Sequence, residues 1–201
     1  MATRFSEEIK SLLTRLAEQP LTVADLTMET AERGFALGIG LLVLPFLLPM
    51  PPGLTTILGG ASLLLSVQMV LGRRSPWLPR RIAQYQFPQK MARQLLSPLN
   101  RLSRWVERIA QPRWAGLTQH PLIWQINGLC FVWLTLLLMS PIPGTNPIPT
   151  VGILILVIAT LEEDGLLLCI GYGLMSLITA LFGVILYLLW RSPELIQNWL
   201  N

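Results

Sequence analysis

Charged residues are scarce in this chain, and the side chains that usually perform catalysis are scarcer still. Charged residues make up 13% of the 201 positions, against roughly 25% in a typical soluble domain. There is one histidine, His120, and the two cysteines, Cys130 and Cys169, have neither metal-ligand spacing nor a CxxC arrangement. We find no pattern of a Ser/His/Asp set or of a glycine-rich phosphate loop. We therefore expect no enzyme activity, no metal and no cofactor.

The few charges leave three long stretches without any Asp, Glu, Lys or Arg: residues 34–72, 114–161 and 166–190. About 20 helical residues cross a hydrocarbon core of roughly 30 Å, so each stretch is long enough to span a bilayer. The first two are long enough to enter and return. Together with a mean hydropathy of +0.55, this pattern predicts an all-α integral membrane protein.

The charged segments divide the chain around these stretches. Residues 1–33 have apolar positions at helical spacing and both signs of charge, which predicts amphipathic helices rather than a cleavable signal peptide. Residues 34–72 then form a first membrane unit, and residues 73–113 a basic connector. Residues 114–201 form a second membrane unit with a final apolar helix and a short tail.

The connector, residues 73–113, holds ten Lys or Arg and a single acid, Glu107. Ser97 and Pro98 suit the start of a basic amphipathic helix, which is typical of the boundary between lipid headgroups and acyl chains. The excess of basic residues places this connector in the cytoplasm. Nucleic-acid binding is the other usual interpretation of such a charge run. Its position between membrane stretches favours the lipid bilayer as partner instead.

The two membrane units follow one plan: an apolar helix, a Pro/Gly break and a second apolar helix. The breaks contain Pro49, Pro51, Pro52 and Gly53 in the first unit and Pro141, Pro143, Gly144, Pro147 and Pro149 in the second. Beyond the breaks, Gly59 and Gly72 lie 93 residues before Gly152 and Gly165. The units therefore resemble duplicated helical hairpins. Broken helices in paired, inverted repeats are typical of transporters.

Two interpretations of the breaks stay open. Proline stops a helix, and unpaired backbone groups cost several kcal/mol each in lipid, so both breaks must meet protein or water. Each break is either an interfacial turn between two full spans or the tip of a re-entrant hairpin near the middle of the membrane. The re-entrant form is considered because the arm of about 15 residues before the first break is only about 22 Å long as a helix.

The polar residues near the breaks and helix ends are the candidates for a solute site. These candidate substrate-binding residues are Glu162, Glu163, Asp164, Thr145, Asn146 and Gln68. The three acids lie between two apolar helices, and a carboxylate drawn into the membrane would favour a bound cation or proton. A solvated turn is the alternative for the acids. Because one straight helix separates them from the threonine and asparagine, a second repeat or subunit would have to complete the site.

The motifs of the first unit also resemble those of a known family, the ExoD-type exopolysaccharide synthesis proteins. They are a Pro-Pro-Gly break (Pro51, Pro52, Gly53), a Gln before a Gly-Arg pair (Gln68, Gly72, Arg73) and a following Pro-Trp-Leu-Pro (Pro76, Trp77, Leu78, Pro79). The similarity extends over roughly residues 20–190. It implies a bacterial inner-membrane protein connected with exopolysaccharide production and with growth at alkaline pH, and it identifies no reaction.

These observations lead to a functional hypothesis and an alternative. The hypothesis is a transporter of a small cation or cationic solute, with proton coupling as one option, that acts as a homodimer because two hairpins and one helix are few for a complete pathway. The alternative is a non-transporting accessory membrane protein of exopolysaccharide synthesis. A membrane-embedded enzyme is the third and least favoured option.

Overall fold

The computed structural model describes residues 34–48, 54–73, 75–79, 113–118, 120–140 and 145–200, together with Ser11, Thr14 and Gln84. Every element within these ranges is a helix, in agreement with the all-α prediction. The amphipathic helices expected in residues 1–33 and nearly all of the basic connector lie outside the described residues. So do seven residues of the expected breaks: Pro49, Pro51, Pro52, Gly53, Pro141, Pro143 and Gly144.

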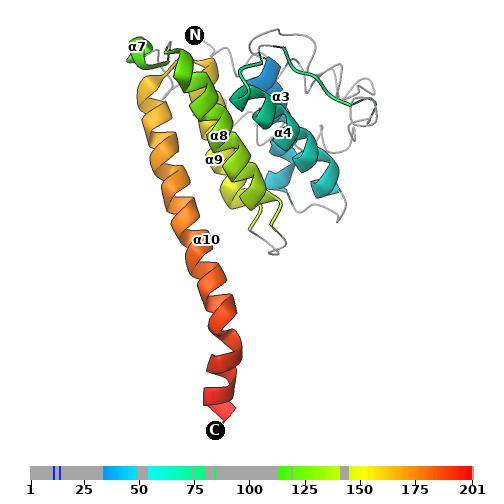
Figure 1. Cartoon of the computed structure of the whole chain (residues 1–201), viewed down its shortest axis with the longest axis vertical. Coiled ribbons are helices and arrows are strands. Elements are labelled where there is room, and N and C mark those ends of the chain that lie inside the picture. Colours follow the sequence, from blue (N-terminus) through cyan, green and yellow to red (C-terminus); the bar gives the residue numbers. More distant parts are fainter. Residues whose placement is uncertain are drawn as a thin grey trace.

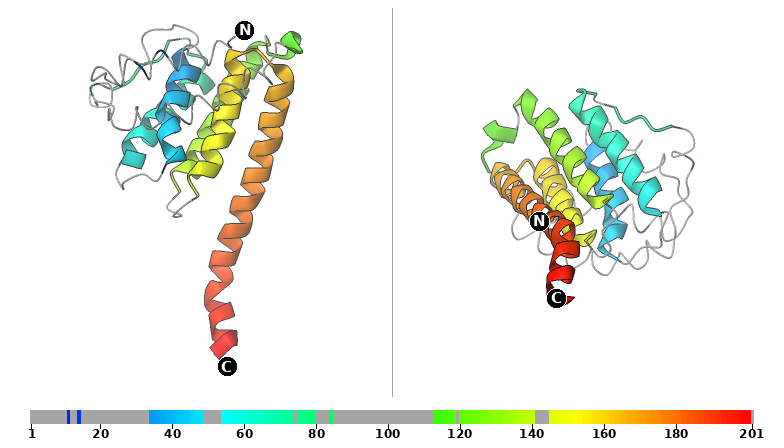
Figure 2. Two further views of the ribbon diagram at one scale, coloured as in Figure 1. Left: turned by 180° about the vertical axis from the view of Figure 1, so that it is seen from behind. Right: turned by 60° about the horizontal axis from the view of Figure 1, so that its bottom comes forward.

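Four apolar helices form a bundle, and a fifth, much longer helix runs along its side and past its end (Figures 1 and 2). The elements are α3 (Gly34–Val43), the 3-10 helix η1 (Leu44–Leu47), α4 (Leu54–Val70), the short α7 (Ala115–Thr118), α8 (Pro121–Leu138), α9 (Pro147–Leu161) and α10 (Gly165–Leu200). The last helix, which the sequence left open as one helix or a broken one, is continuous over 36 residues.

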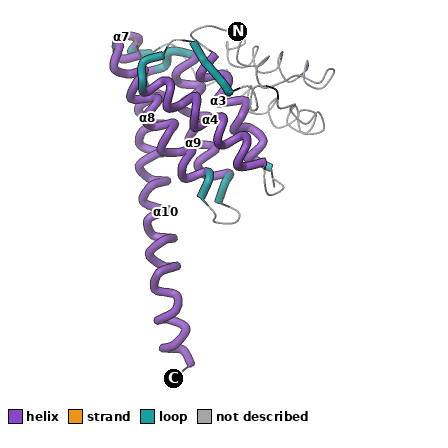
Figure 3. The backbone as a smooth tube through the Cα atoms, turned by 45° about the vertical axis from the view of Figure 1, so that its right-hand side comes forward, coloured by secondary structure: helices purple, strands orange, loops and turns teal. Residues whose placement is uncertain are grey.

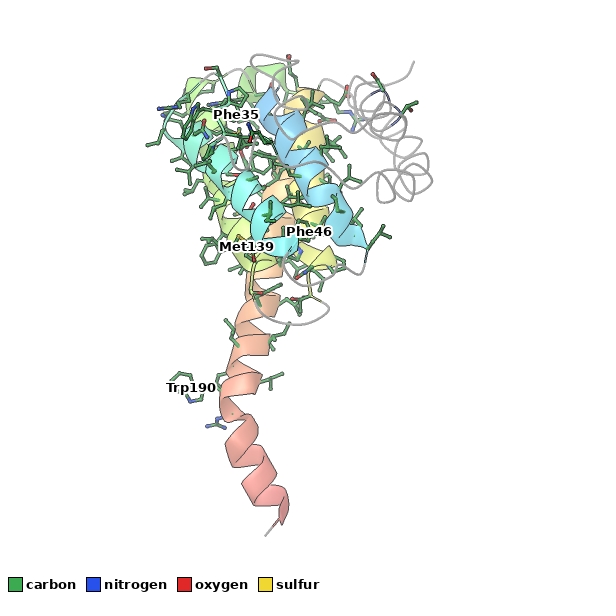
Figure 4. All side chains as sticks on the ribbon, turned by 90° about the vertical axis from the view of Figure 1, so that its right-hand side faces the viewer. Phe35, Phe46, Met139 and Trp190 are labelled. Atoms are coloured by element: carbon green, nitrogen blue, oxygen red, sulfur yellow. The ribbon has the colours of Figure 1, made fainter. Side chains whose placement is uncertain are left out.

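Both hairpins run in the same direction along the bundle. Helices α3 and α8 begin at the end where α7 lies, and the residues that flank both breaks lie at the other end (Figure 3). Phe46 and Met139 mark that second end, and Phe35 marks the first (Figure 4). A Cβ atom on Gly59 would lie 2.9 Å from Cγ of Met139, which places the start of α4 against the end of α8. This parallel arrangement does not support the expected inverted repeat.

Glycines allow the two hairpins to approach each other closely. A Cβ on Gly128 of α8 would lie 2.8 Å from Cβ of Met69 on α4 and 2.8 Å from the backbone nitrogen of Val70. On the other side of the bundle, a Cβ on Gly40 of α3 would lie 3.0 Å from Val157 of α9. Small residues are common at such crossings in membrane proteins, because helices there associate through close packing.

The second break is shorter than the sequence suggested. Pro147 and Pro149, which were assigned to it, lie in the first turn of α9, where a missing backbone N–H costs nothing because that group has no partner inside the helix. At the other end of the hairpins, Gly72 (φ +73°) follows α4 and Glu163 (φ +54°) follows α9 in left-handed conformations. Gly165, which the sequence aligned with Gly72, instead begins α10.

One described helix is long and apolar enough to cross a membrane: the Gly165–Leu188 part of α10, which has 24 residues. At 1.5 Å per residue this part is about 36 Å long. The apolar parts of the other four bundle elements are shorter: Gly34–Leu47, Thr56–Val70, Leu122–Leu138 and Pro147–Leu161. A membrane-associated, all-helical protein is therefore supported, whereas duplication of the hairpins and re-entrant tips stay predictions.

Candidate functional site

The acidic cluster lies in the turn between α9 and α10, where Asp164 caps the long helix. Its side chain is 1% exposed, and its Oδ1 accepts hydrogen bonds from the backbone N–H groups of Leu166 (3.0 Å) and Leu167 (3.1 Å). An aspartate in this position satisfies N–H groups that the helix itself leaves unpaired, and its charge is favourable at a helix N-terminus. Asp164 thus has a clear structural role.

The other proposed ligands lie at the far end of α9. Glu162 and Glu163 are half-buried beside Asp164, whereas Thr145 and Asn146 precede the first turn of α9. The helix between them has 15 residues, or a length of about 22 Å. A single copy of the chain does not bring the two groups together. The shared cavity expected between them, which needs a second copy, stays a prediction.

Gln68, the remaining candidate, holds the chain segment that follows α4. Its side-chain Nε2 donates to the carbonyl oxygen of Trp77 at 2.7 Å, and its Oε1 accepts from the backbone N–H of Trp77 at 2.8 Å. Nε2 also contacts the carbonyl of Leu64 at 3.2 Å. In the sequence, Gln68 and Trp77 belong to two separate motifs. The structure joins them, and their two hydrogen bonds fix the segment of residues 75–79 against the helix.

A buried polar network links α8, α9 and α10, and sequence reasoning missed it. Asn127 is 2% exposed; its Nδ2 donates to Oγ1 of Thr160 at 3.1 Å, and its Oδ1 accepts from the hydroxyl of Tyr172 at 2.6 Å. Thr160 in turn donates to the carbonyl of Leu156 at 2.7 Å. The only signal in the sequence was an asparagine in the middle of a charge-free stretch, which carries no spacing rule.

A second polar contact lies between the hairpins. The hydroxyls of Ser62 on α4 and Thr135 on α8 are 3.4 Å apart, and Ser66 donates to the carbonyl of Ser62 at 2.8 Å. Within the described part of the chain, Trp124 Nε1 and Ser140 Oγ are the buried side-chain atoms without a hydrogen-bond partner. Most buried polar side chains thus have hydrogen-bond partners within the protein, either backbone groups or other side chains.

A groove lies between α8 and α10. It has a volume of about 530 Å³ and is lined by Leu129, Cys130, Trp133, Met175, Ser176 and Thr179. The indole Nε1 of Trp133 donates to Oγ1 of Thr179 at 2.8 Å and so connects the two helices. Among the described residues, no cluster of three or more His, Cys, Asp or Glu side chains could hold a metal ion. His120, the single histidine, caps α8 by accepting from the N–H of Leu122 at 3.3 Å.

The chain is similar to proteins of a known family. The family model "Exopolysaccharide synthesis, ExoD" matches residues 5–184. Protein ExoD of Rhizobium meliloti is 34% identical over 190 residues, which cover 90% of this chain and 77% of the relative. An uncharacterized protein of Synechocystis is 27% identical over 204 residues, which cover 98% of this chain and 96% of that protein. No solved structure matches. With this match and this identity, the chain belongs to the ExoD family of exopolysaccharide synthesis proteins.

Proposed function

We propose that this chain is an integral membrane protein that serves exopolysaccharide production as a non-transporting accessory component. The family description supports the connection with exopolysaccharide. The observation that carries the non-transporting role is the interior of the bundle. Four fully buried phenylalanines, Phe35, Phe46, Phe131 and Phe182, help to fill it, and most of its polar side chains already have hydrogen-bond partners within the protein.

A solute pathway would need polar groups with unused hydrogen-bonding capacity along the bundle. Asp164 is the one fully buried carboxylate among the described residues, and it lies at the end of α9 as a helix cap. The networks around Asn127 and Thr135 join helices to each other. In transporters, by contrast, ionisable groups inside the membrane face a cavity or a pathway. The cation-transport hypothesis and its homodimer therefore receive no support from this arrangement.

The outer surface supports insertion in a bilayer. On α8, exposed apolar side chains recur every three or four residues: Leu122, Ile126, Leu129, Trp133 and Leu136. On α10, Leu177 is 67% exposed. Contiguous apolar surface of this kind is unusual on a soluble monomer and typical of a lipid-facing surface. Trp114 and Trp190, near opposite ends of the apolar part of α10, are exposed as residues of an interfacial aromatic belt would be.

The position of the breaks along α10 does not decide between interfacial turns and tips in the middle of the membrane. A Cβ on Gly152 of α9 would lie 2.9 Å from Cδ1 of Ile178 on α10. Because the two helices are antiparallel, the start of α9 at Pro147 is level with about residue 183 of α10. The exposed Trp190 then lies about two helical turns further along, or roughly 11 Å. The centre of the apolar part lies near residue 177, so the breaks are roughly 9 Å from the centre and roughly 11 Å from Trp190.

The decisive experiment measures polysaccharide and transport with the same protein. In its host, a strain that lacks the chain is expected to produce less exopolysaccharide, and the intact chain to restore it. In proteoliposomes, the purified protein is expected to give no Na⁺, K⁺ or proton flux above that of empty vesicles, with or without a pH gradient. Saturable flux that Glu162→Gln or Asp164→Asn abolishes would establish transport instead.

A matched pair of variants links the phenotype to the structure. Gln68→Leu removes both hydrogen bonds to Trp77 and is expected to reduce complementation, because the first segment of the basic connector loses its attachment to α4. Val67→Leu changes the neighbouring exposed position on the same helix and is the control. Normal polysaccharide in the complete absence of the chain would contradict the proposed role.

A further inference from the structure

We propose that the groove between α8 and α10 binds a hydrocarbon chain of a membrane phospholipid as a defined site. This inference rests on the membrane insertion proposed above. It does not depend on the role in exopolysaccharide production. The groove lies between two helices whose neighbouring side chains are exposed and apolar, so it faces the environment that would be the lipid core of the bilayer.

The size of the groove is suited to a chain. Its volume is about 530 Å³, within the range of about 300–1,000 Å³ that is typical of sites for small ligands. Leu129 and Trp133 form one wall from α8, and Met175 forms part of the other from α10. Methionine adapts its shape to irregular apolar partners. An acyl chain would therefore contact apolar atoms on both sides.

The polar atoms of the lining are already used within the protein. The hydroxyl of Ser176 donates to the carbonyl of Tyr172 at 3.1 Å, and the hydroxyl of Thr179 donates to the carbonyl of Met175 at 2.8 Å. The indole N–H of Trp133 donates to that same Thr179 hydroxyl. No donor from these three side chains remains for a ligand. The groove thus presents an apolar surface despite its two hydroxyls, as a hydrocarbon chain requires.

The link between Trp133 and Thr179 also distinguishes a lipid chain from a helix of a second copy. Packed helices keep their axes 8–10 Å apart, so a helix that entered between α8 and α10 would need their axes roughly 16–20 Å apart. A direct side-chain hydrogen bond of 2.8 Å holds the two helices closer than that. A second copy could cover the groove but not fill it, whereas a thin, flexible chain fits within it.

Photolabelling tests the proposal. The full-length protein is reconstituted into phosphatidylethanolamine/phosphatidylglycerol vesicles that contain a phosphatidylethanolamine with a diazirine in its acyl chain. After illumination, adducts are mapped by mass spectrometry. We expect groove residues such as Leu129 and Met175 to be labelled several-fold more than Leu177, although Leu177 is the more exposed lipid-facing residue. Equal labelling of the groove and Leu177 would mean bulk lipid only and would overturn the proposal.

Variants that fill the groove provide a second test of the lipid site. Ser176→Phe places a ring in the groove and is expected to reduce groove labelling several-fold, whereas the matched Leu177→Phe leaves it unchanged. Leu129→Phe, with Leu136→Phe as its control on α8, repeats the comparison from the other wall if the first variant does not fold. Groove labelling that persists in a folded groove-filling variant would overturn the site.

Two further outcomes separate the competing explanations. Efficient cross-linking between copies through Ser176→Cys would show that a second copy occupies the groove, and it would overturn the lipid site. Labelling that is absent from Leu177 and Leu136 as well as from the groove would show that the protein is not embedded, so that membrane insertion itself fails. Labelling of those two residues without the groove leaves insertion intact and overturns only the site.

Discussion

The bundle and the long helix α10 use apolar residues in different ways. In α3 every residue is buried, and the helix is only 10 residues long. The apolar part of α10 is 24 residues long, and 22% of its most apolar 18-residue stretch is buried. Beyond the bundle this helix runs alone (Figure 1). The apolar residues of the bundle hold helices together, whereas most of those on α10 face outward. Similar composition therefore does not mean similar sensitivity to substitution.

The largest expected difference is between two glycines. Gly128→Ala places a Cβ 2.8 Å from the backbone nitrogen of Val70, where no side-chain movement can relieve the contact, and it should destabilise the protein by about 1–3 kcal/mol. Gly173→Ala on α10 meets nothing within 4 Å and should be neutral or slightly stabilising. Thermal unfolding in detergent measures both. Equal effects of the two substitutions would remove the distinction between bundle and long helix.

Removing a buried polar contact should likewise cost more stability than removing an outward-facing one. Asn127→Leu leaves the hydroxyl of Tyr172 without its acceptor and removes the donor to Thr160, whose hydroxyl still donates to the carbonyl of Leu156. It should cost about 1–2 kcal/mol, near the upper end for hydrogen bonds between membrane helices. Adding Tyr172→Phe should recover part of that loss, because one unsatisfied group disappears. Trp133→Phe, which removes the outward-facing bond to Thr179, should cost less. A double-mutant cycle with no coupling between Asn127 and Tyr172 would contradict the network.

Substitutions of Asp164 test whether its negative charge or its capping of α10 is important for stability. Asparagine caps helices about as well as aspartate, whereas alanine does not, so Asp164→Ala should cost about 1 kcal/mol and Asp164→Asn only a few tenths. Circular dichroism during thermal unfolding measures the difference. If the two substitutions were equally damaging, the negative charge rather than the cap would be the important property. The cation-site hypothesis would then regain support.

The sequence predicted much of the fold, because charge-free stretches and Pro/Gly breaks are local properties. They indicated the helical class, the apolar helices and the order of the hairpins. The direction of the second hairpin relative to the first depends on contacts between distant residues, such as Gly128 against Met69, and no local pattern predicts them. That is why the inverted relation expected from transporter analogies was not supported.

The candidate site was less predictable, for a related reason. The acids stood out in an apolar sequence, but the same residue type serves as a helix cap and as a ligand. Only the contact of Asp164 with the N–H groups of Leu166 and Leu167 identified the cap. The network of Asn127 joins residues of three helices that are far apart in the sequence, and the hydrogen bonds between Gln68 and Trp77 join residues across a turn. Composition and periodicity contain no information about such pairs.

The smallest expected effect compares the ends of α4 and α9. After α4, Gly72 takes a left-handed conformation, and the N–H of Arg73 donates to the carbonyl of Gln68 at 3.0 Å. After α9, Glu163 takes the same conformation, and the N–H of Asp164 donates to the carbonyl of Ala159 at 3.0 Å. Both ends thus share one capping geometry, in which glycine is normally preferred.

Exchanging the residue types at these two ends should therefore have opposite effects. Glu163→Gly relieves a left-handed conformation that a side chain disfavours, and it should stabilise the protein by up to about 1 kcal/mol, partly offset by the greater freedom of glycine in the unfolded chain. Gly72→Ala should destabilise it by a similar amount. Unfolding temperatures of the two variants, with Glu163→Gln as the control that keeps the backbone strain, measure this. Destabilisation by Glu163→Gly would mean that the glutamate side chain contributes more than its conformation costs, and a functional role for Glu163 would then be favoured over a simple turn.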